Sequence, residues 1–533
     1  MSVRTSLAGL CLGAACSLGT GCTVWTDYGE KTEDAREAFQ VGDFDRAYQI
    51  YKEDLDATND GFLYTLEAGT AAHFAKRYDE SLKLFDTIYR RLDAHQEQAL
   101  AESAAQVVGS ILVNEKTITY FGSIFEQVLT QAYQARNDFL RGRRDEVLVD
   151  IRRCYEIQKR AREIYDKELK FCEQEARVKN GDNVLDQSKV ENELSQAYSY
   201  SGKELAAPED VYDLAWVRYL NAWLREATAR NPGDYNQAWI DLKFVADRMG
   251  KHPFVVQDLA RMAEAAGAVD EAQELRQRAK LEPIPPEYGS VVLFFECGMA
   301  PRKREVKVIF PTYKGAAAVA VPVYESVPNP VQAAELVLGE RRMRTVPFTN
   351  LDAVAFRFHK DQLPLMIAKM VIRLIVKIGL QSGGTVAIEQ STRGTKNEGI
   401  GQLAALGFSA LTSVYNVISE QADLRCWRTL PQTFQAVRLY LPAGEYPCRI
   451  RLIGGGGEFD LGTIKVAAGK HRMINARSIG TRLFWEVPAE PYDGAKGKRA
   501  VEEQLTRDIL GEGAPEPGEP VRPKGKKKAP SPQ

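Results

Sequence analysis

The spacing of hydrophobic and polar residues changes once along this chain, near residue 283. Between residues 30 and 282, apolar and small residues recur at intervals of three and four, which is the spacing of amphipathic helices. From residue 290 onward, short runs of β-branched and aromatic residues end at glycine or proline, which is typical of strands. The pattern therefore predicts a helical domain over residues 30–282 and an α+β domain over residues 283–487.

The helical region contains a repeated pattern. Residues 32–53 fit two amphipathic helices separated by Gly42 and Asp43, and related strings follow at residues 68–85 and, more weakly, 259–275. A glycine permits a tight turn between helices, and alanines allow close packing, as in tetratricopeptide repeats with their period of about 34 residues. We expect a tetratricopeptide-like α-helical solenoid whose groove binds envelope proteins or peptides. A helical spacer without a ligand is the alternative.

Other helices of this region are predicted from the same spacing. They cover residues 124–139, 144–157, 156–178, 211–226, 235–248 and 255–266, with a polar loop over residues 179–207. The segment 211–226 carries a stripe of aromatic residues at helical spacing, formed by Tyr212, Trp216, Tyr219 and Trp223. Such a stripe favours a place in the core over a ligand site.

The α+β region is predicted to contain eight strands and two long helices. The strands cover residues 290–295, 305–310, 316–324, 351–358, 433–441, 444–453, 462–467 and 472–476, and residues 331–338 fit either a helix or a strand. The helices cover residues 362–380 and 399–418; Pro364 falls in the first turn of the former, and Gly383-Gly384 ends it. This arrangement favours a small β-sandwich or meander packed on the two helices.

The helix at 362–380 allows two interpretations. Its apolar residues and its lysines and arginines lie on different sides, as in helices that bind a membrane surface. The same pattern fits a helix that covers a sheet and exposes its cations to solvent. We favour the second, because the adjoining strands need a cover.

The first 22 residues are typical of a secretory signal. Arg4 precedes a short apolar run over residues 7–15, and small residues lead to Cys22. Cys22 fits a lipidated cysteine, although Leu18 stands one place too early for the usual lipobox; Cys16, with the same offset from Leu12, is a weaker rival site. We therefore expect an exported protein attached to the outer membrane, on the periplasmic side, through a lipid on Cys22. A plain cleaved signal is the alternative.

Composition limits what the rest of the chain does. The 533 residues carry a net charge of −2, so there is no general attraction to nucleic acid, and no later segment is apolar enough to span a membrane. The five cysteines beyond the signal lack the spacing of a zinc site. Cys426 and Cys448 form either a disulfide or two buried thiols, and we favour thiols. Residues 488–533 are rich in proline and lysine and are predicted to be disordered.

No motif in the chain predicts a catalytic site. HExxH, GxSxG and GxxxxGK[ST] are absent, and the glycine run at 454–457 fits a hairpin. We therefore expect neither enzymatic activity nor a metal or other cofactor. The alternative is an envelope enzyme, for example a glycan hydrolase, that uses Glu296 or Asp423. Two carboxylates about 5 to 10 Å apart in a cleft would favour that alternative.

Two short stretches of the α+β region resemble the signatures of a known family. Residues 296–303 read Glu-Cys-Gly-Met-Ala-Pro-Arg-Lys, and residues 422–431 read Ala-Asp-Leu-Arg-Cys-Trp-Arg-Thr-Leu-Pro. They resemble the E-x-G-x-A-P-x-K and A-D-x-R-x-W-x-x-L-P stretches of an uncharacterised family of bacterial outer-membrane lipoproteins with tetratricopeptide-like helices. The resemblance implies a non-enzymatic scaffold. Genes of this family often lie beside genes for lipoproteins that resemble peptidoglycan-synthase activators, so the resemblance also points toward envelope assembly.

The candidate site residues come from these two stretches. They are Glu296, Lys303, Asp423, Arg425 and Trp427. In a strand, Asp423, Arg425 and Trp427 would share one face, where the arginine could form an ion pair and a cation–π contact. We favour a structural latch that joins the second long helix to the final sheet, with a binding site as the alternative.

Overall fold

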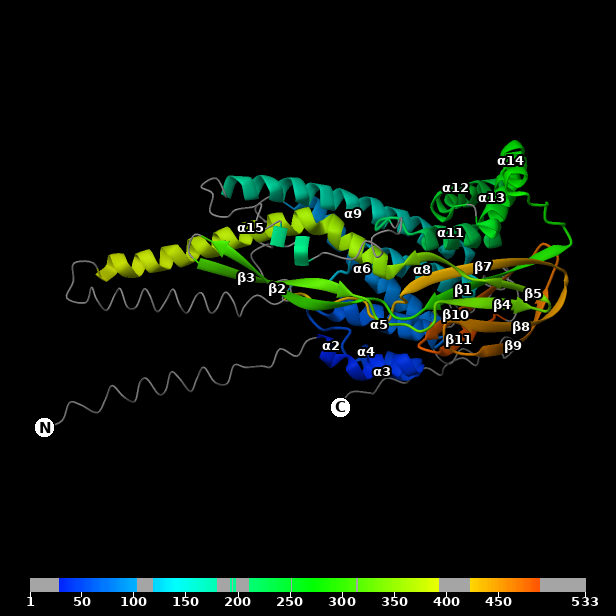
Figure 1. Cartoon of the computed structure of the whole chain (residues 1–533), viewed down its shortest axis with the longest axis horizontal. Helices are drawn as coiled ribbons and strands as arrows, with labels where there is room; N and C mark the ends of the chain where they lie inside the picture. Colours follow the sequence, from blue (N-terminus) through cyan, green and yellow to red (C-terminus); the bar gives the residue numbers. More distant parts are fainter. Residues whose placement is uncertain are drawn as a thin grey trace, which may run out of the picture.

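The computed structural model describes residues 28–102, 118–179, 192–193, 195–197, 210–250, 252–312, 315–392 and 422–488. The signal segment with Cys22, most of the polar loop at 179–207, the helix predicted at 399–418 and the tail from residue 489 lie outside the described residues. Within them, helices fill the N-terminal half and strands dominate the C-terminal half (Figure 1). This confirms the predicted mixed fold, with helices first and a β-rich region after them.

Most N-terminal helices form antiparallel pairs of consecutive segments. They are α2 (Tyr28–Lys31), α3 (Glu33–Val41), α4 (Phe44–Lys52), α5 (Gly61–Phe74), α6 (Tyr78–Ala101), α8 (Ile124–Leu140), α9 (Arg144–Lys179), α11 (Ala215–Thr228), α12 (Pro232–Met249), α13 (Pro253–Ala265) and α14 (Val269–Ala279). Of the predicted aromatic stripe, Trp216, Tyr219 and Trp223 lie on α11 and are at most 2% exposed, as expected for core residues, whereas Tyr212 precedes the helix and is partly buried.

Four of these pairs turn in the same way. Gly42, Lys76, Gly142 and Gly267 each adopt a left-handed backbone, with φ between 61° and 91°. In each turn this residue donates its N–H to the carbonyl three residues earlier, and the next residue donates to the carbonyl five residues earlier. This is the Schellman motif, which satisfies the last carbonyls of a helix and reverses the chain. Gly42 and Lys76 are 34 positions apart.

The strands form three sheets. They are β1 (Tyr288–Cys297), β2 (Arg302–Thr312), β3 (Gly315–Glu325), β4 (Ala333–Leu338), β5 (Arg341–Arg344), β6 (Val346–Asn350), β7 (Thr433–Pro442), β8 (Gly444–Ile453), β9 (Glu458–Val466), β10 (His471–Ile479) and β11 (Arg482–Glu486). The orders are β11-β10-β1-β7-β6, β5-β4-β8-β9 and the β2–β3 hairpin. Only β1 and β10 pair in parallel among the described strands. The sequence pattern missed β5, β6 and β11.

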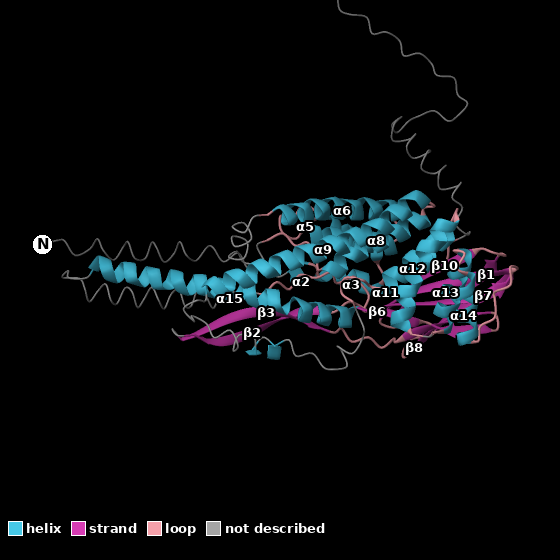
Figure 2. Ribbon diagram, turned by 90° about the horizontal axis from the view of Figure 1, so that it is seen from above, coloured by secondary structure: helices cyan, strands magenta, loops and turns pink. Residues whose placement is uncertain are grey.

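Strand β1 is buried on both faces, and each face belongs to a different core. Val292 and Phe294 belong to a core formed with the N-terminal helices, whereas Val291, Leu293 and Phe295 belong to a core shared with the four-stranded sheet. Figure 2 shows helices α11 to α13 beside β1 and β7. The five-stranded sheet is therefore covered by the N-terminal helices on one face. The predicted cover of this sheet by the helix at 362–380 is wrong, and the helix predicted at 399–418 lies outside the described residues.

A projecting arm forms the other part of the fold. It consists of the β2–β3 hairpin, the C-terminal half of α9 and the long helix α15 (Leu351–Thr392), which extend together from the body (Figures 1 and 2). Val308, Val319, Leu365 and Val371 are among the buried residues of its own apolar cluster. Up to residue 372, where the description of side chains ends, α15 thus covers a sheet, as favoured for the helix at 362–380, but that sheet is the β2–β3 hairpin.

Helix α15 differs from its predicted course at both ends. Residues 351–358 were predicted as a strand, yet they form the first turns of the helix. Asn350 explains this, because its side-chain oxygen accepts the N–H groups of Asp352 and Ala353 at 3.0 and 3.4 Å and so caps the helix. Pro364 consequently lies inside the helix, and the helix continues through Gly383-Gly384 to Thr392. No described helix is long and apolar enough to cross a membrane.

Candidate functional site

Glu296 is buried at the junction of the helices and the five-stranded sheet. Its carboxylate accepts hydrogen bonds from Arg136, from Arg477 at 3.1 Å and from the hydroxyl of Tyr133 at 2.7 Å. Burial alone would raise the pKa of Glu296, but the guanidinium groups of Arg136 and Arg477 outweigh it and lower the pKa. Glu296 therefore remains a carboxylate that ties α8 to β1 and β10, and it is a poor proton donor.

The predicted latch residues lie in an irregular segment rather than in a strand. Arg425 pairs with Asp423 at 2.8 Å, as predicted, and also with Asp60 at 3.1 Å. Its guanidinium lies 5.4 Å from the ring centre of Tyr120. Trp427 donates its indole N–H to Thr70 at 3.0 Å. The segment thus docks onto the N-terminal helices. Its predicted link to the second long helix concerns residues outside the described part of the chain.

Two buried glutamates that the sequence reasoning missed hold the same segment. Glu67 of α5 accepts hydrogen bonds from the backbone N–H groups of Arg428 and Thr429, at 2.8 and 3.1 Å, and from the Thr429 hydroxyl. Glu126 of α8 accepts the N–H of Trp427 at 2.7 Å. Burial raises the pKa of Glu67 to about 7. The sequence did contain a signal, because Glu67 is the single carboxylate in helix α5, whose other residues are mostly apolar or small.

The two signature stretches meet in the structure. Lys303 donates to the carbonyl of Arg425 at 2.9 Å, and Ala300 donates its N–H to the carbonyl of Leu430 at 2.7 Å. Glu296 belongs to the same stretch as Lys303, but it points into the separate cluster with Arg136 and Arg477. The five candidate residues therefore divide between two buried joints.

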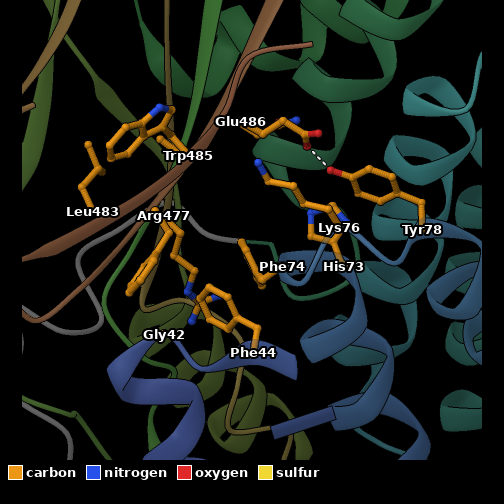
Figure 3. A pocket seen from close by; sticks show the side chains of 13 residues that line it. Gly42, Phe44, His73, Phe74, Lys76, Tyr78, Arg477, Leu483, Trp485 and Glu486 are labelled. Carbon is orange, nitrogen blue, oxygen red and sulfur yellow. Dashed lines mark hydrogen bonds between the residues drawn. The ribbon is translucent and has the colours of Figure 1, made fainter. Parts of the chain in front are cut away.

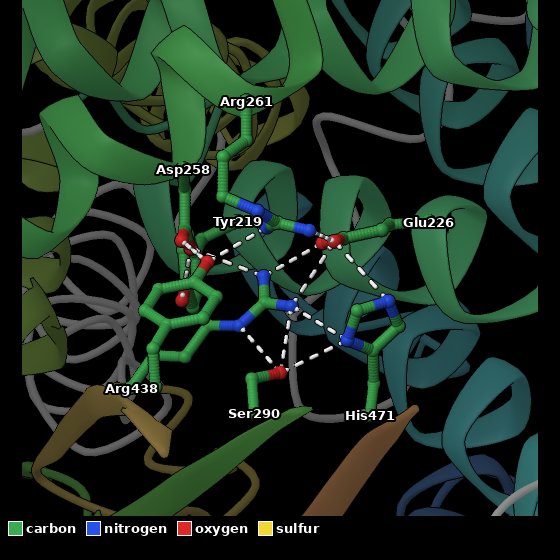
Figure 4. A network of polar contacts seen from close by, with 8 residues as sticks. Tyr219, Glu226, Asp258, Arg261, Ser290, Arg438 and His471 are labelled. Atoms are coloured by element: carbon green, nitrogen blue, oxygen red, sulfur yellow. Dashed lines mark hydrogen bonds and ion pairs between the residues drawn. The ribbon is translucent and has the colours of Figure 1, made fainter. Parts of the chain in front are cut away.

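A second charged network, also missed from the sequence, contains a serine, a histidine and a glutamate in contact (Figure 4). The Ser290 hydroxyl lies 2.9 Å from His471 Nδ1, and His471 Nε2 lies 3.3 Å from Glu226. Burial lowers the pKa of His471 to about 3, so the imidazole is neutral. These contacts have the order of a nucleophile, a base and an orienting acid.

The environment of Ser290 opposes a nucleophilic role. The residue is fully buried, and Arg438 donates two hydrogen bonds to its oxygen, at 2.9 and 3.0 Å. With its own hydrogen directed to His471, the hydroxyl has no lone pair left for a reacting carbon. The serine therefore serves as a structural partner of Arg438.

Arg438 is the centre of this network. It lies 2.6 Å from Glu226 and 3.3 Å from Asp258, and Arg261 also pairs with Glu226 at 2.5 Å. Burial alone would raise the pKa of Glu226, but the two guanidinium groups outweigh it and hold the pKa well below its usual range. Since Glu226 lies on α11, Asp258 on α13 and Arg438 on β7, the network fastens two helices to the sheet.

A cavity of about 470 Å³ opens between the turns of the first helix pairs and strands β10 and β11 (Figure 3). Its walls include several aromatic side chains, among them Phe44, Phe74, Phe484 and Trp485. At the rim, the hydroxyl of Tyr78 donates to Glu486. Neither Glu296 nor Asp423 lines this cavity.

The remaining predictions about ligand chemistry concern metals and cysteines. No group of three His, Cys, Asp or Glu side chains suited to a metal occurs in the part of the chain that the structure describes. All five cysteines beyond the signal are described, and each is a buried free thiol, Cys426 and Cys448 included. Comparison with family models, curated proteins and solved structures finds no match to this chain.

Proposed function

We propose that this protein is a non-enzymatic envelope lipoprotein that acts as a protein-binding scaffold in envelope assembly. The observation that carries the proposal is the Schellman turn repeated at Gly42, Lys76, Gly142 and Gly267. Helix pairs joined by one recurring turn support a tetratricopeptide-like solenoid, a fold whose surface commonly binds peptides or proteins. The core shared by the five- and four-stranded sheets likewise supports a β-sandwich.

The state of the buried carboxylates also favours a scaffold over a glycan hydrolase. A hydrolase needs one accessible carboxyl group as an acid and a second as a base or nucleophile. Glu296 is 1% exposed and neutralised by two arginines, and Asp423 pairs with Arg425. These side chains are committed to joints within the protein.

Exposed apolar side chains on the helix pairs mark the surface for the experiment. Val41, Ile240 and Val269, on α3, α12 and α14, are between 46% and 56% exposed. A photo-crosslinking amino acid placed at each position in intact cells should capture the same envelope proteins reproducibly, as identified by mass spectrometry. Glu445, exposed on β8, serves as the control position. Equal capture at Glu445, or capture of abundant porins alone, would contradict the scaffold.

Membrane attachment is tested separately through Cys22. In a lipoprotein this cysteine carries the acyl chains, so Cys22→Ser should move the protein from the membrane fraction to the soluble fraction. Cys448→Ser, at a buried thiol of β8, is the matched control for loss of a cysteine. If Cys22→Ser stays in the membrane fraction, Cys22 is not the lipid anchor and the first 22 residues act only as an export signal.

A further inference from the structure

The cavity between the first helix pairs and β10–β11 combines apolar walls with unused hydrogen-bond donors. Asn475 and Arg477 line it, and each keeps one buried N–H group without a partner among the described residues, at Asn475 Nδ2 and Arg477 Nε. Asn475 is 7% exposed and Arg477 is fully buried. Because a buried donor without a partner costs about 1–3 kcal/mol, such groups favour a ligand that brings an acceptor.

The charges around the cavity leave an excess of one positive charge. Arg136 and Arg477 share the carboxylate of Glu296, and Lys76 and Glu486 line the cavity with opposite charges. His73, also in the lining, is neutral, because burial lowers its pKa to about 3. Among the lining side chains, Lys76 and Arg477 are thus cations and Glu486 is the carboxylate, so a ligand with one negative charge would balance the excess.

Size and walls define the rest of the ligand. A volume of about 470 Å³ falls in the range of small-molecule sites, roughly 300–1,000 Å³. The aromatic walls, with Phe44, Phe74, Phe484 and Trp485, suit an apolar or aromatic group. In Figure 3, Arg477 reaches from its strand toward Phe44 and Phe74, while Lys76 stands beside Tyr78 and Glu486.

We propose that this cavity binds an organic monocarboxylate with an apolar or aromatic body. Both a peptide C-terminus that ends in an apolar residue and a free aromatic acid have this chemistry. Lys76 supplies the accessible cation for the carboxylate, and Asn475 supplies a buried donor in the wall. None of the exposed residues Val41, Ile240 and Val269 lines the cavity, so binding to the cavity is tested separately from the scaffold function.

Calorimetric titration of the purified full-length protein tests the site. The probe is N-acetyl-phenylalanine, and its amide, which has the same body without the charge, is the comparison. We expect the acid to bind roughly tenfold more tightly than the amide, since the amide loses a charge-assisted hydrogen bond. Equal binding of the two, or no heat from the acid at millimolar concentration, would overturn the proposal.

A pair of lysine variants tests the position of the carboxylate. Lys76→Met keeps the length of the side chain and removes the charge, and it should weaken binding of the acid roughly fivefold. Lys280→Met is the matched control, because Lys280 is also exposed, also left-handed with φ 53°, and also follows a helix, but it does not line the cavity. An equal loss in both variants, or none in Lys76→Met, contradicts the site. Circular dichroism confirms that both are folded.

Two further probes separate the sources of the carboxylate. 3-Phenylpropionate represents a free acid, and glycyl-glycyl-phenylalanine represents a peptide C-terminus. Tighter binding of the peptide supports capture of a C-terminus, and tighter binding of the small acid supports a metabolite-like ligand. Failure of both probes to displace N-acetyl-phenylalanine from the cavity would overturn the inference.

Discussion

The body and the arm both have apolar cores, but they differ in how deeply they bury charged side chains. In the body, charged side chains are buried between helices and sheet and satisfy one another, as with Arg438, Glu226 and Asp258. In the arm, apolar side chains such as Val308 and Val371 form the cluster, and the ion pair of Lys369 with Glu168 is partly exposed. Buried charges demand one geometry, whereas apolar contacts tolerate small shifts. The body is therefore expected to be rigid and the arm to open locally.

The largest expected effect comes from removing the centre of the body's network. Arg438→Met leaves Glu226 and Asp258 buried without their main partner, and it should lower the free energy of unfolding by about 3–5 kcal/mol in urea titrations. Arg449→Met is the matched control on the same region, because Arg449 pairs with Glu458 on the surface of β8 and β9. It should cost at most about 1 kcal/mol. Similar losses in both variants would remove the distinction between buried and surface pairs.

The next effect is a pH dependence at the joint that holds residues 427–429. Since the folded protein raises the pKa of Glu67 from its ordinary 4.5 to about 7, the folded state binds this proton more tightly than the unfolded state. The contribution of Glu67 is therefore fully present below pH 4.5 and is lost as the pH rises toward and through 7. The linkage predicts a loss of up to roughly 3 kcal/mol over this window.

Glu67→Gln tests this linkage, because glutamine imitates the protonated acid. The variant should show a smaller loss of stability than the natural protein between pH 5 and pH 8, as measured by urea unfolding at several pH values. Glu445→Gln, at an exposed carboxylate of β8, should leave the pH profile as it is. Identical profiles for Glu67→Gln and the natural protein would exclude Glu67 as the source.

The body also shows why the sequence predicted the elements better than the site. Spacing alone located the helix pairs and most strands, because the period of the apolar residues reports which face is buried. The partners in the buried networks come from distant parts of the chain, and Glu226 and Arg438 are 212 positions apart. No local pattern contains that pairing. A charged residue in an apolar element, such as Glu67 in α5, is the signal available from sequence.

In the arm, by contrast, the spacing of residues predicted an element wrongly. Apolar and polar residues alternate over 351–358 as in a strand, yet these residues form a helix. The cap that Asn350 provides decides between the two structures. The four turns between N-terminal helices were easier to predict from the sequence, because three of them contain a glycine. Lys76 occupies the fourth in the same left-handed conformation, and the repeat period located it where residue type did not.

A smaller effect is expected from the apolar cluster of the arm. Val371→Ala removes two buried methyl groups and should destabilise the arm by about 2 kcal/mol. Hydrogen exchange should therefore accelerate in α15, β2 and β3 while β1 and β10 remain protected. Val292→Ala, an equally buried valine of β1, should accelerate exchange in the body instead. Faster exchange throughout the chain in Val371→Ala would show that the arm is not a separate unit.

The smallest effect should come from the ion pair within the arm. Lys369 lies 2.9 Å from Glu168, and both side chains are about one-third exposed, so solvent screens their attraction. Lys369→Met keeps the apolar stem of the side chain. In low salt it should change the free energy of local opening of α15, as measured by hydrogen exchange, by less than about 1 kcal/mol, and in 0.5 M salt the change should be smaller still. A loss as large as that of Val371→Ala, unaffected by salt, would mean that the arm also depends on charge geometry, as the body does.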